Sequence, residues 1–449
     1  MNMAKASAQA STKKASAKRS NIENMYPLSP MQEGLLFHSL LSPTAGTYVP
    51  QIVLSFSGQL DGNLLRQAWE KVVTEHSILR TGFNREQREQ PFQVVYRQPA
   101  QAEKLWIEKS WIEQDWQRLS AVEQSAKLKI LLDCNRSEPF NLNQPPLLRL
   151  HWIQRGDNRY YLIWCYHHLI LDGWSASQLL KEVFQSYFSL RGNSSPATRA
   201  ISYPYGDYIA WLKQQNIAEA ESFWQRYLQD WEGSTSLPIL KAQRIRPQEQ
   251  NAQPLADQQR PLSEKTTQKL KAFAQTHKIT LNTIVQAALG LVLSRYCDTP
   301  DVVFGATCAG RPSGLAGALS MVGLFINTLP VRVQVEKEAG VINWLQALSA
   351  QQATTTDYEY VSLRSLQSLV NQGNSLFDTL LVFESYPVST DMFNRQTDLQ
   401  LEDIQFNEWT HFPLTILVSG EQQLTFTAKY RADQLTSEAV SRLLGHLNN

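Results

Sequence analysis

The feature that most constrains the fold of this chain is a nearly unbroken apolar run that ends in two adjacent histidines. Residues 160–174 read YYLIWCYHHLILDGW, and residues 147–159 before them read LLRLHWIQRGDNR. Together they predict two strands joined at a Gly-Asp-Asn turn. Successive side chains of a strand point to opposite faces, so His167 and His168 cannot normally serve the same site. We expect one to be structural and the other to be available for chemistry.

A tight turn and a helix follow the second strand. The turn is expected at Asp172 and Gly173, and Ser175 or Ser177 is expected to cap the helix. The helix has one apolar stripe, made of Leu179, Leu180, Val183, Phe184, Tyr187 and Phe188. Rigid scaffolds often present catalytic groups at such ends of elements. The histidines are therefore either satisfied core residues or part of a catalytic site, in which Asp172 orients an imidazole or pairs with a buried cation.

Two lobes are expected, because 449 residues exceed what one ordinary core accommodates. Helical and strand patterns are mixed in both halves, and the first helix is expected from about Met31. Residues 191–200, RGNSSPATRA, are typical of a boundary. We therefore expect an N-terminal lobe over residues 21–195 and a C-terminal lobe over residues 196–449. The sequence stops in a helical pattern without a C-cap signal, which predicts that more protein follows.

The composition argues against several kinds of partner. The chain has 42 basic and 41 acidic side chains, so no overall field favours nucleic acid or an anionic membrane. Neither a secretory signal nor a run of roughly 20 apolar residues is found, which predicts a cytoplasmic protein. The cysteines lack the spacing of metal ligands, so no metal site is expected; they are Cys134, Cys165, Cys297 and Cys308.

The first 20 residues form a separate segment in composition. They carry five basic side chains, no acidic one and almost no large apolar one. Such a segment cannot bury enough apolar surface to offset the entropy lost on ordering. A flexible basic tail over residues 1–20 is therefore predicted.

The histidine run resembles the HHxxxDG signature of the condensation domains of nonribosomal peptide synthetases. In this chain the signature reads HHLILDG over residues 167–173. Other motifs of that family have counterparts in the same order along residues 21–449: YPLSPMQEGLLFHSLL, EHSILRTGF, YPYGDYIAW, VGLFINTLPVRV, DYEYVSL and LFDTLLVFES. By contrast, AGRP at residues 309–312 reads only as a turn.

This resemblance implies an α+β fold of two chloramphenicol-acetyltransferase-like lobes, which form a V-shaped pseudo-dimer with a tunnel between them. It implies an acyltransferase that joins a donor aminoacyl or peptidyl thioester to the amine of an acceptor aminoacyl thioester. Both substrates are held on 4'-phosphopantetheine arms that donor and acceptor peptidyl carrier proteins supply, and no bound cofactor is implied. A downstream adenylation domain is expected in the full-length chain, and residues 1–20 are either a simple tail or a docking segment for an upstream synthetase.

The resemblance also suggests roles for particular residues. His168 is expected beside the acceptor amine, as a general base or as a group that orients the amine, and His167 is expected to be structural. Gly173 lies near a backbone N–H that could stabilise an oxyanion. Asp172 is expected to form a structural ion pair with Arg80. Three further residues are candidates for substrate binding: Trp174, Ser175 and Asn327. For Asn327 a second role, in which its side chain caps a turn, is equally open.

Sister activities within the same fold remain alternatives. Heterocyclisation domains replace the histidines with a DxxxxD pattern, which this position lacks, and the acidic motif of epimerisation domains is not found. A degenerate module that binds carriers without catalysis and an acyltransferase that uses coenzyme A thioesters are further alternatives. The opening motif YPLSPMQEGLLFHSLL differs from the QxRLW type, so the chain most resembles the subtype that accepts a D-configured donor.

Overall fold

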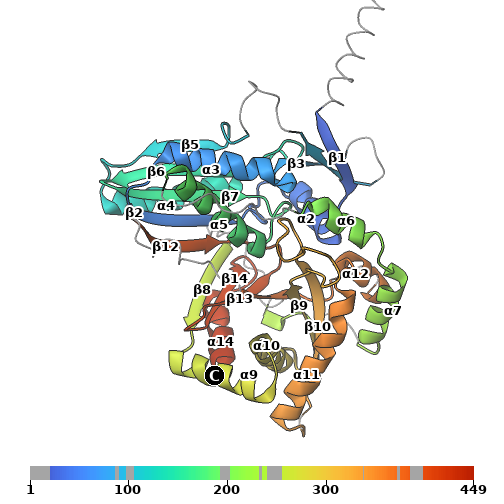
Figure 1. Ribbon diagram of the computed structural model, residues 1–449. Coiled ribbons are helices and arrows are strands. Elements are labelled where there is room, and N and C mark those ends of the chain that lie inside the picture. Colours follow the sequence, from blue (N-terminus) through green and yellow to red (C-terminus); the bar gives the residue numbers. More distant parts are fainter. Residues whose placement is uncertain are drawn as a thin grey trace, which may run out of the picture. The chain divides into compact units, whose positions relative to one another are not determined.

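The computed structural model describes residues 21–85, 90–97, 106–192, 203–231, 235–239, 255–336, 338–371, 375–384 and 398–449 (Figure 1). The predicted tail at residues 1–20 lies outside this set. The described chain forms two compact units. The first contains the residues up to Gln214 together with Arg311–Phe325 and 398–409, and the second contains the remainder.

This division corrects the predicted cut between residues 195 and 196. Residues 398–409 come from the C-terminal half, yet they pair in register with a strand of the first unit, and Arg311–Phe325 bonds to the start of one of its helices. The local pattern of a sequence predicts helices and strands but not which strands pair. A single boundary between two lobes therefore could not predict that two later segments belong to the first unit. Residues 193–200 of the predicted boundary stretch lie outside the described residues.

The first unit is built on a five-stranded sheet. Its strands lie in the order β12 (Leu399–Asn407), β2 (Gln51–Gly58), β7 (Arg159–Tyr166), β6 (Leu148–Gly156) and β5 (Trp111–Asp115). Neighbouring strands are antiparallel except for β5 and β6, which are parallel. Strands β6 and β7 are the two strands predicted from the apolar run. Strand β7 is the central strand of the sheet, so the two histidines lie directly after a buried strand.

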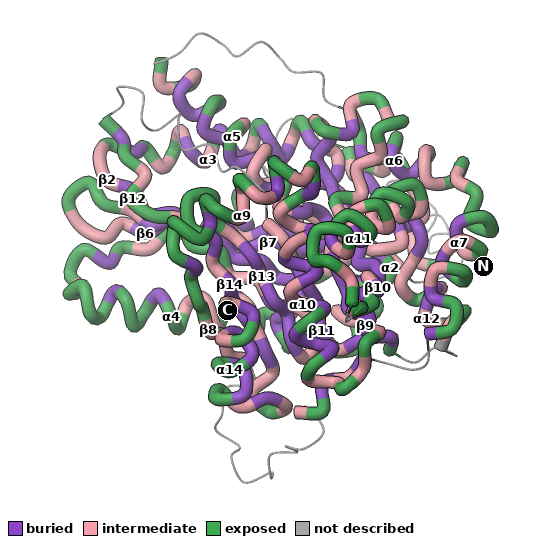
Figure 2. Tube along the Cα trace, turned by 90° about the horizontal axis from the view of Figure 1, so that it is seen from below, coloured by how far each residue is buried: buried purple, intermediate pink, exposed green. Residues whose placement is uncertain are grey.

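Helices cover both faces of this sheet, which explains why β7 is apolar on both sides. On one face, Ile163 and Cys165 of β7 belong to a buried cluster with Leu128 of α4 (Ala121–Ser137). On the other face, Trp164 packs edge-on against Trp69 of α3 (Gly62–Glu75), with 4.9 Å between ring centroids. Helix α3 packs against α5 (Gly173–Leu190). Figure 2 shows most of β7 buried, and only its first two residues are exposed or partly exposed.

A smaller sheet and three short elements complete the first unit. The sheet has the order β1 (Ile22–Pro27), β4 (Phe92–Tyr96) and β3 (Thr81–Asn84). The other elements are α2 (Pro30–Leu41), the 3-10 helix η1 (Ser77–Arg80) and α6 (Tyr205–Leu212). Helix α2 begins one residue before the predicted start, because Ser29 forms a capping box with Gln32.

The second unit packs helices on a six-stranded sheet. Its strand order is β10 (Asn327–Gln334), β9 (Asp301–Cys308), β11 (Thr379–Phe383), β13 (Leu414–Ser419), β14 (Thr425–Arg431) and β8 (Leu255–Pro261). The helical elements are α7 (Ile217–Tyr227), α9 (Glu264–His277), α10 (Leu281–Cys297), α11 (Val341–Thr355), η2 (Thr356–Tyr358), α12 (Leu363–Asn371) and α14 (Ser437–Asn448). Leu289, Leu444 and Ile416, from α10, α14 and β13, share one buried cluster.

A membrane span requires a helix that is both long and apolar. Within the described ranges, no helix meets both requirements.

Candidate active site

The two histidines directly follow the last residue of β7. The His167 N–H donates to the Leu147 carbonyl and the His168 N–H to the Tyr48 carbonyl, both at 2.9 Å. These acceptors belong to segments on opposite sides of β7, so the alternation of the strand continues past its end. The two imidazoles consequently contact different groups, as the sequence predicts.

His168 is buried against a carboxylate. Its Nε2 lies 2.9 Å from Oε1 of Glu408, and the side chains of His168 and Glu408 are 5% and 34% exposed. Its Nδ1 is buried and has no hydrogen-bond partner of good geometry among the described residues. Burial alone would lower the pKa of His168, but Glu408, with a smaller contribution from Asp172, raises this pKa above its ordinary value. The imidazole is therefore stabilised in its protonated form.

His167 is buried in a different environment. Its Nδ1 accepts a hydrogen bond from the Leu169 N–H at 3.1 Å, so its Nε2–H donates to Ser39 Oγ, also at 3.1 Å. Burial, followed by the charge of His168, lowers the pKa of His167 to about 3. His167 is thus a neutral side chain that supports the loop after β7.

Replacing His167 by alanine is expected to destabilise the fold by about 1–3 kcal/mol, because the Leu169 N–H loses its acceptor. The variant should also change the pH dependence of stability. An unfolded histidine binds a proton near pH 6.5, whereas folded His167 does so only near pH 3. The unfolded state therefore binds more protons between these values, and stability falls as the pH falls through this window.

Urea unfolding of the wild type and His167→Ala between pH 7 and pH 4 measures both effects. A shallower fall in the free energy of unfolding is expected for the variant. An identical pH dependence, or a stable variant that has lost only catalysis, would contradict the structural role of His167.

Asp172 has no exposed surface and organises the start of α5. Its Oδ1 accepts from the Ser175 N–H at 2.8 Å and its Oδ2 from the Phe325 N–H at 3.0 Å. Asp172 is thus the N-cap of α5, and Gly173 is the first helical residue. The prediction that Ser175 or Ser177 caps this helix is wrong, because the carboxylate of Asp172, three residues before Ser175, already accepts the N–H of the first turn.

The expected ion pair between Asp172 and Arg80 is also wrong. Asp172 pairs with Arg311, whose Nη2 lies 3.2 Å from Oδ1, and the two side chains are 0% and 4% exposed. Arg80 instead lies 2.8 Å from Glu23 and donates to the Tyr96 carbonyl. The returning segment Arg311–Phe325 brings its own cation to Asp172, whereas Arg80 ends η1 beside the small sheet.

Ser175 is occupied by structural hydrogen bonds. Its hydroxyl donates to the Gly323 carbonyl at 2.8 Å and accepts from the Gly323 N–H at 3.0 Å and from Arg311 Nη2 at 2.8 Å. The side chain has no exposed surface. These contacts assign Ser175 to the support of the Asp172–Arg311 pair rather than to substrate binding.

The other candidate residues differ in their surroundings. Trp174 is 36% exposed, and its indole N–H donates to the Leu319 carbonyl at 3.0 Å. Asn327 belongs to the second unit and is buried. Its amide donates to the carbonyls of Glu359 and Val361 at 2.8 and 2.6 Å. These bonds favour the second of the two roles open to Asn327, in which its side chain holds a turn.

Two residues of the site are not evident from the sequence. Arg311 lies in AGRP, which reads as a turn, although a buried Asp172 requires a nearby cation. Glu408 lies 240 residues from His168 in the sequence. No local pattern marks it, because β12 brings it into the first unit only through long-range pairing.

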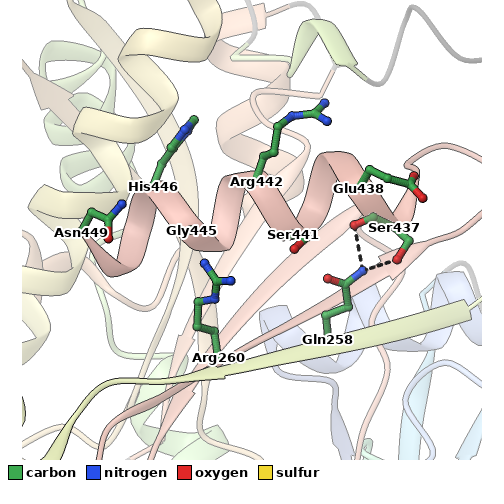
Figure 3. Close-up of a pocket in the computed structure, with 9 residues that line it drawn as sticks. All are labelled: Gln258, Arg260, Ser437, Glu438, Ser441, Arg442, Gly445, His446 and Asn449. Carbon is green, nitrogen blue, oxygen red and sulfur yellow. Dashed lines mark hydrogen bonds between the residues drawn. The ribbon is translucent and has the colours of Figure 1, made fainter.

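A surface groove in the second unit is lined by other residues. Figure 3 shows it between β8 and α14, where Gln258 crosses it with hydrogen bonds to the Ser437 carbonyl at 2.9 Å and hydroxyl at 2.7 Å. None of the candidate residues lines this groove. In the part of the chain that the structure describes, no three His, Cys, Asp or Glu side chains are placed to share a metal ion.

Known proteins resemble this chain in sequence along nearly its whole length. Residues 22–449 match the family described as Condensation domain. One of the linear gramicidin synthase proteins of Brevibacillus parabrevis is 37% identical over 431 residues, which cover 95% of this chain and 5% of that protein. One of the mycosubtilin synthase proteins of Bacillus subtilis is 33% identical over 438 residues, covering 95% of this chain and 16% of that protein. The chain therefore spans a small part of the length of both relatives.

Solved structures with the same fold include the first condensation domain of the calcium-dependent antibiotic synthetase. It matches with a TM-score of 0.75 and 17% identity, over 95% of both chains. At that identity the likeness concerns the fold alone, and it confirms the expected condensation-type α+β fold. Given the family match over residues 22–449 and relatives of 37% identity along 95% of its length, the chain belongs to the condensation domains of nonribosomal peptide synthetases.

Proposed function

We propose that this chain forms an amide bond between two thioester-bound substrates. The donor is an aminoacyl or peptidyl group, the acceptor is an aminoacyl group, and each is carried on the 4'-phosphopantetheine arm of a carrier protein. The observation that supports this most strongly is the placement of His168 at the end of β7, buried against Glu408, within a chain of the condensation family.

The reaction requires alignment more than strong chemical activation. The neutral acceptor amine attacks the thioester carbonyl, the C–N bond forms, the C–S bond breaks, and one proton passes from nitrogen to the departing sulfur. The thioester is already activated, so alignment of the reactants supplies much of the rate, up to ~7–11 kcal/mol in favourable intramolecular cases. In this proposal His168 lies beside the amine, while Asp172 and Arg311 hold the end of β7 and the start of α5 in place.

We propose donor and acceptor carrier proteins, and a neighbouring adenylation domain, as the partners of this chain. The relatives belong to peptide synthases, and one solved structure of the same fold is a four-domain nonribosomal peptide synthetase bound to AMP and glycine, which supports a neighbouring adenylation domain. The chain covers 32% of that structure, at a TM-score of 0.73. Residues 1–20 remain a candidate docking segment for an upstream synthetase.

A two-carrier assay distinguishes this function from its alternatives. Donor and acceptor carriers are loaded separately with a panel of aminoacyl groups, and both carrier affinity and amide formation are measured. A binding module would retain affinity and form no amide. The coenzyme A alternative has a specific basis, because a related starter domain was solved with C8-CoA. Comparable rates with coenzyme A thioesters and no dependence on carriers would favour that alternative.

The donor residue is predicted to have the D configuration. Support comes from the opening motif YPLSPMQEGLLFHSLL, which runs from the end of β1 through α2. Inverting the α-carbon exchanges side chain and hydrogen, which displaces the thioester, and a displacement of about 1 Å can reduce the rate on the order of a hundredfold. A D-ended peptidyl donor should therefore condense much faster than its L-ended epimer with the same L-aminoacyl acceptor.

The two donors are loaded chemically and tested without any epimerase, so that they cannot interconvert. Equal rates, or a preference for the L-ended donor, would contradict the D-donor prediction while leaving the proposed condensation activity intact.

A further inference from the structure

We infer that Glu408 is a positioning residue for His168, which holds the imidazole through Nε2 and fixes its orientation and charge. The inference rests on the proposed function insofar as His168 serves the reaction. It assigns Glu408 no bond-making step. Its starting point is the contact of 2.9 Å between His168 Nε2 and Glu408 Oε1.

Tyr48 links the backbone of His168 to that of Trp409, which follows Glu408 in the sequence. The Tyr48 N–H donates to the Trp409 carbonyl at 3.0 Å, and the Tyr48 carbonyl accepts from the His168 N–H at 2.9 Å. Tyr48 is 5% exposed and adopts a positive φ of 64°, a conformation that is rare for a residue of this size. His168 and Trp409, the residue after Glu408, are therefore both hydrogen-bonded to one buried residue, which fixes the backbone next to Glu408 relative to the backbone of His168.

Only one nitrogen of His168 has a polar partner among the described side chains. Nδ1 is buried without a hydrogen-bond partner of good geometry, so the interaction with Glu408 fixes the ring. The carboxylate accepts, which means that Nε2 carries the proton. Glu408 is about one-third exposed and His168 almost fully buried, so the carboxylate is the more accessible member of the pair.

Glu408 is the main group that favours the protonated form of His168. In the described part of the chain, the titratable groups that face it are Glu408, the adjacent His167 and Asp172. Asp172 is already paired with Arg311 at 3.2 Å, which offsets its charge. His167 is neutral above about pH 3. With Glu408 removed, burial would dominate and the pKa of His168 would fall.

The first unit contains a matched pair that serves as a control. His76 Nε2 lies 2.6 Å from Glu182 Oε2, and these side chains are 8% and 29% exposed, close to the values for His168 and Glu408. Glu182→Gln removes a carboxylate from a similar histidine pair without touching the motif. Glu408→Gln makes the same chemical change at the inferred position.

Nitrogen NMR of the imidazoles tests the inference without any substrate. The chain has eight histidines, and a His168→Gln sample assigns the His168 signals. In the wild type, the pKa of His168 should lie above the ordinary value of a histidine, and Nε2 should carry a proton. In Glu408→Gln its titration should move to lower pH, and in Glu182→Gln it should not move. A pKa of wild-type His168 at or below the ordinary histidine value, or an unmoved titration in Glu408→Gln, would overturn the inference.

A kinetic experiment tests the same inference with the pair of carrier-bound donor and acceptor substrates that the wild type condenses fastest. Glu408→Gln should lower kcat by about a hundredfold, the effect of a misplacement of about 1 Å, with little change in KM for either carrier. Glu408→Asp should recover part of the loss. The limb of the pH–rate profile that depends on His168 should move to lower pH. If it is the acidic limb, His168 accepts a proton in the reaction, and if it is the alkaline limb, His168 donates one.

The NMR titration and the kinetic experiment test the role of Glu408 and the proposed function separately. If the wild type forms no amide, the proposed function fails while the NMR result still decides the role of Glu408. A full kcat in Glu408→Gln, with an unshifted pH profile, would contradict the positioning role even if condensation is confirmed.

Discussion

His168→Ala is expected to slow amide formation by about 100- to 10,000-fold, the range over which a positioned acid–base side chain acts. The physical reason is the loss of the imidazole that the end of β7 presents and Glu408 holds. Single-turnover quench experiments with both carriers loaded measure the chemical step directly. Carrier loading and carrier affinity should remain at wild-type values.

His76→Ala is the matched control, because it also removes a buried imidazole that pairs with a carboxylate in the first unit. It should alter stability but not the rate of condensation. Condensation by His168→Ala at the wild-type rate would show that the motif histidine is not the functional one. An equal loss of rate in both variants would point to a general disturbance of the first unit.

Arg311→Ala and Asp172→Ala are each expected to lower the free energy of unfolding by about 3–5 kcal/mol. Each substitution leaves an uncompensated charge in a site where the partners are 4% and 0% exposed. Loss of Asp172 additionally removes the N-cap of α5 and the acceptor for the Phe325 N–H. Chemical unfolding in urea, followed by tryptophan fluorescence, measures the change.

A double-mutant cycle tests which arginine is the partner. Asp172 and Arg311 should show a clear coupling energy, whereas Asp172 and Arg80 should be additive within about 0.5 kcal/mol. Arg80 contacts Glu23 and the Tyr96 carbonyl instead. Strong coupling between Asp172 and Arg80 would restore the pairing expected from the sequence and contradict the structure.

The local part of the site could be predicted from the sequence. Alternation along a strand separates His167 from His168, and the structure places Ser39 against one and Glu408 against the other. Strand alternation depends only on neighbouring residues, so a single sequence contains it. The start of α2 is predictable within one residue for the same reason.

The long-range part could not be predicted in this way. Arg311 reaches Asp172 across 139 residues, and Glu408 reaches His168 across 240. Both contacts depend on which segments return to the first unit, and strand pairing is set by register and packing rather than by local pattern. The predicted cap of α5 is wrong because Asp172, Ser175 and Ser177 all have side chains that can cap, and only the fold shows which one faces the free N–H groups.

The most direct test of the proposed activity is the mass of the acceptor carrier after reaction. The wild-type chain is incubated with a donor carrier bearing a D-ended peptidyl group and an acceptor carrier bearing an L-aminoacyl group, and intact mass spectrometry follows both carriers. The acceptor carrier should gain the mass of the donor acyl group while the donor carrier loses it, and with His168→Ala neither should change within the time that the wild type needs to react. An acceptor carrier of unchanged mass with every donor in the panel, although both carriers bind, would contradict the proposal that this domain forms the amide bond.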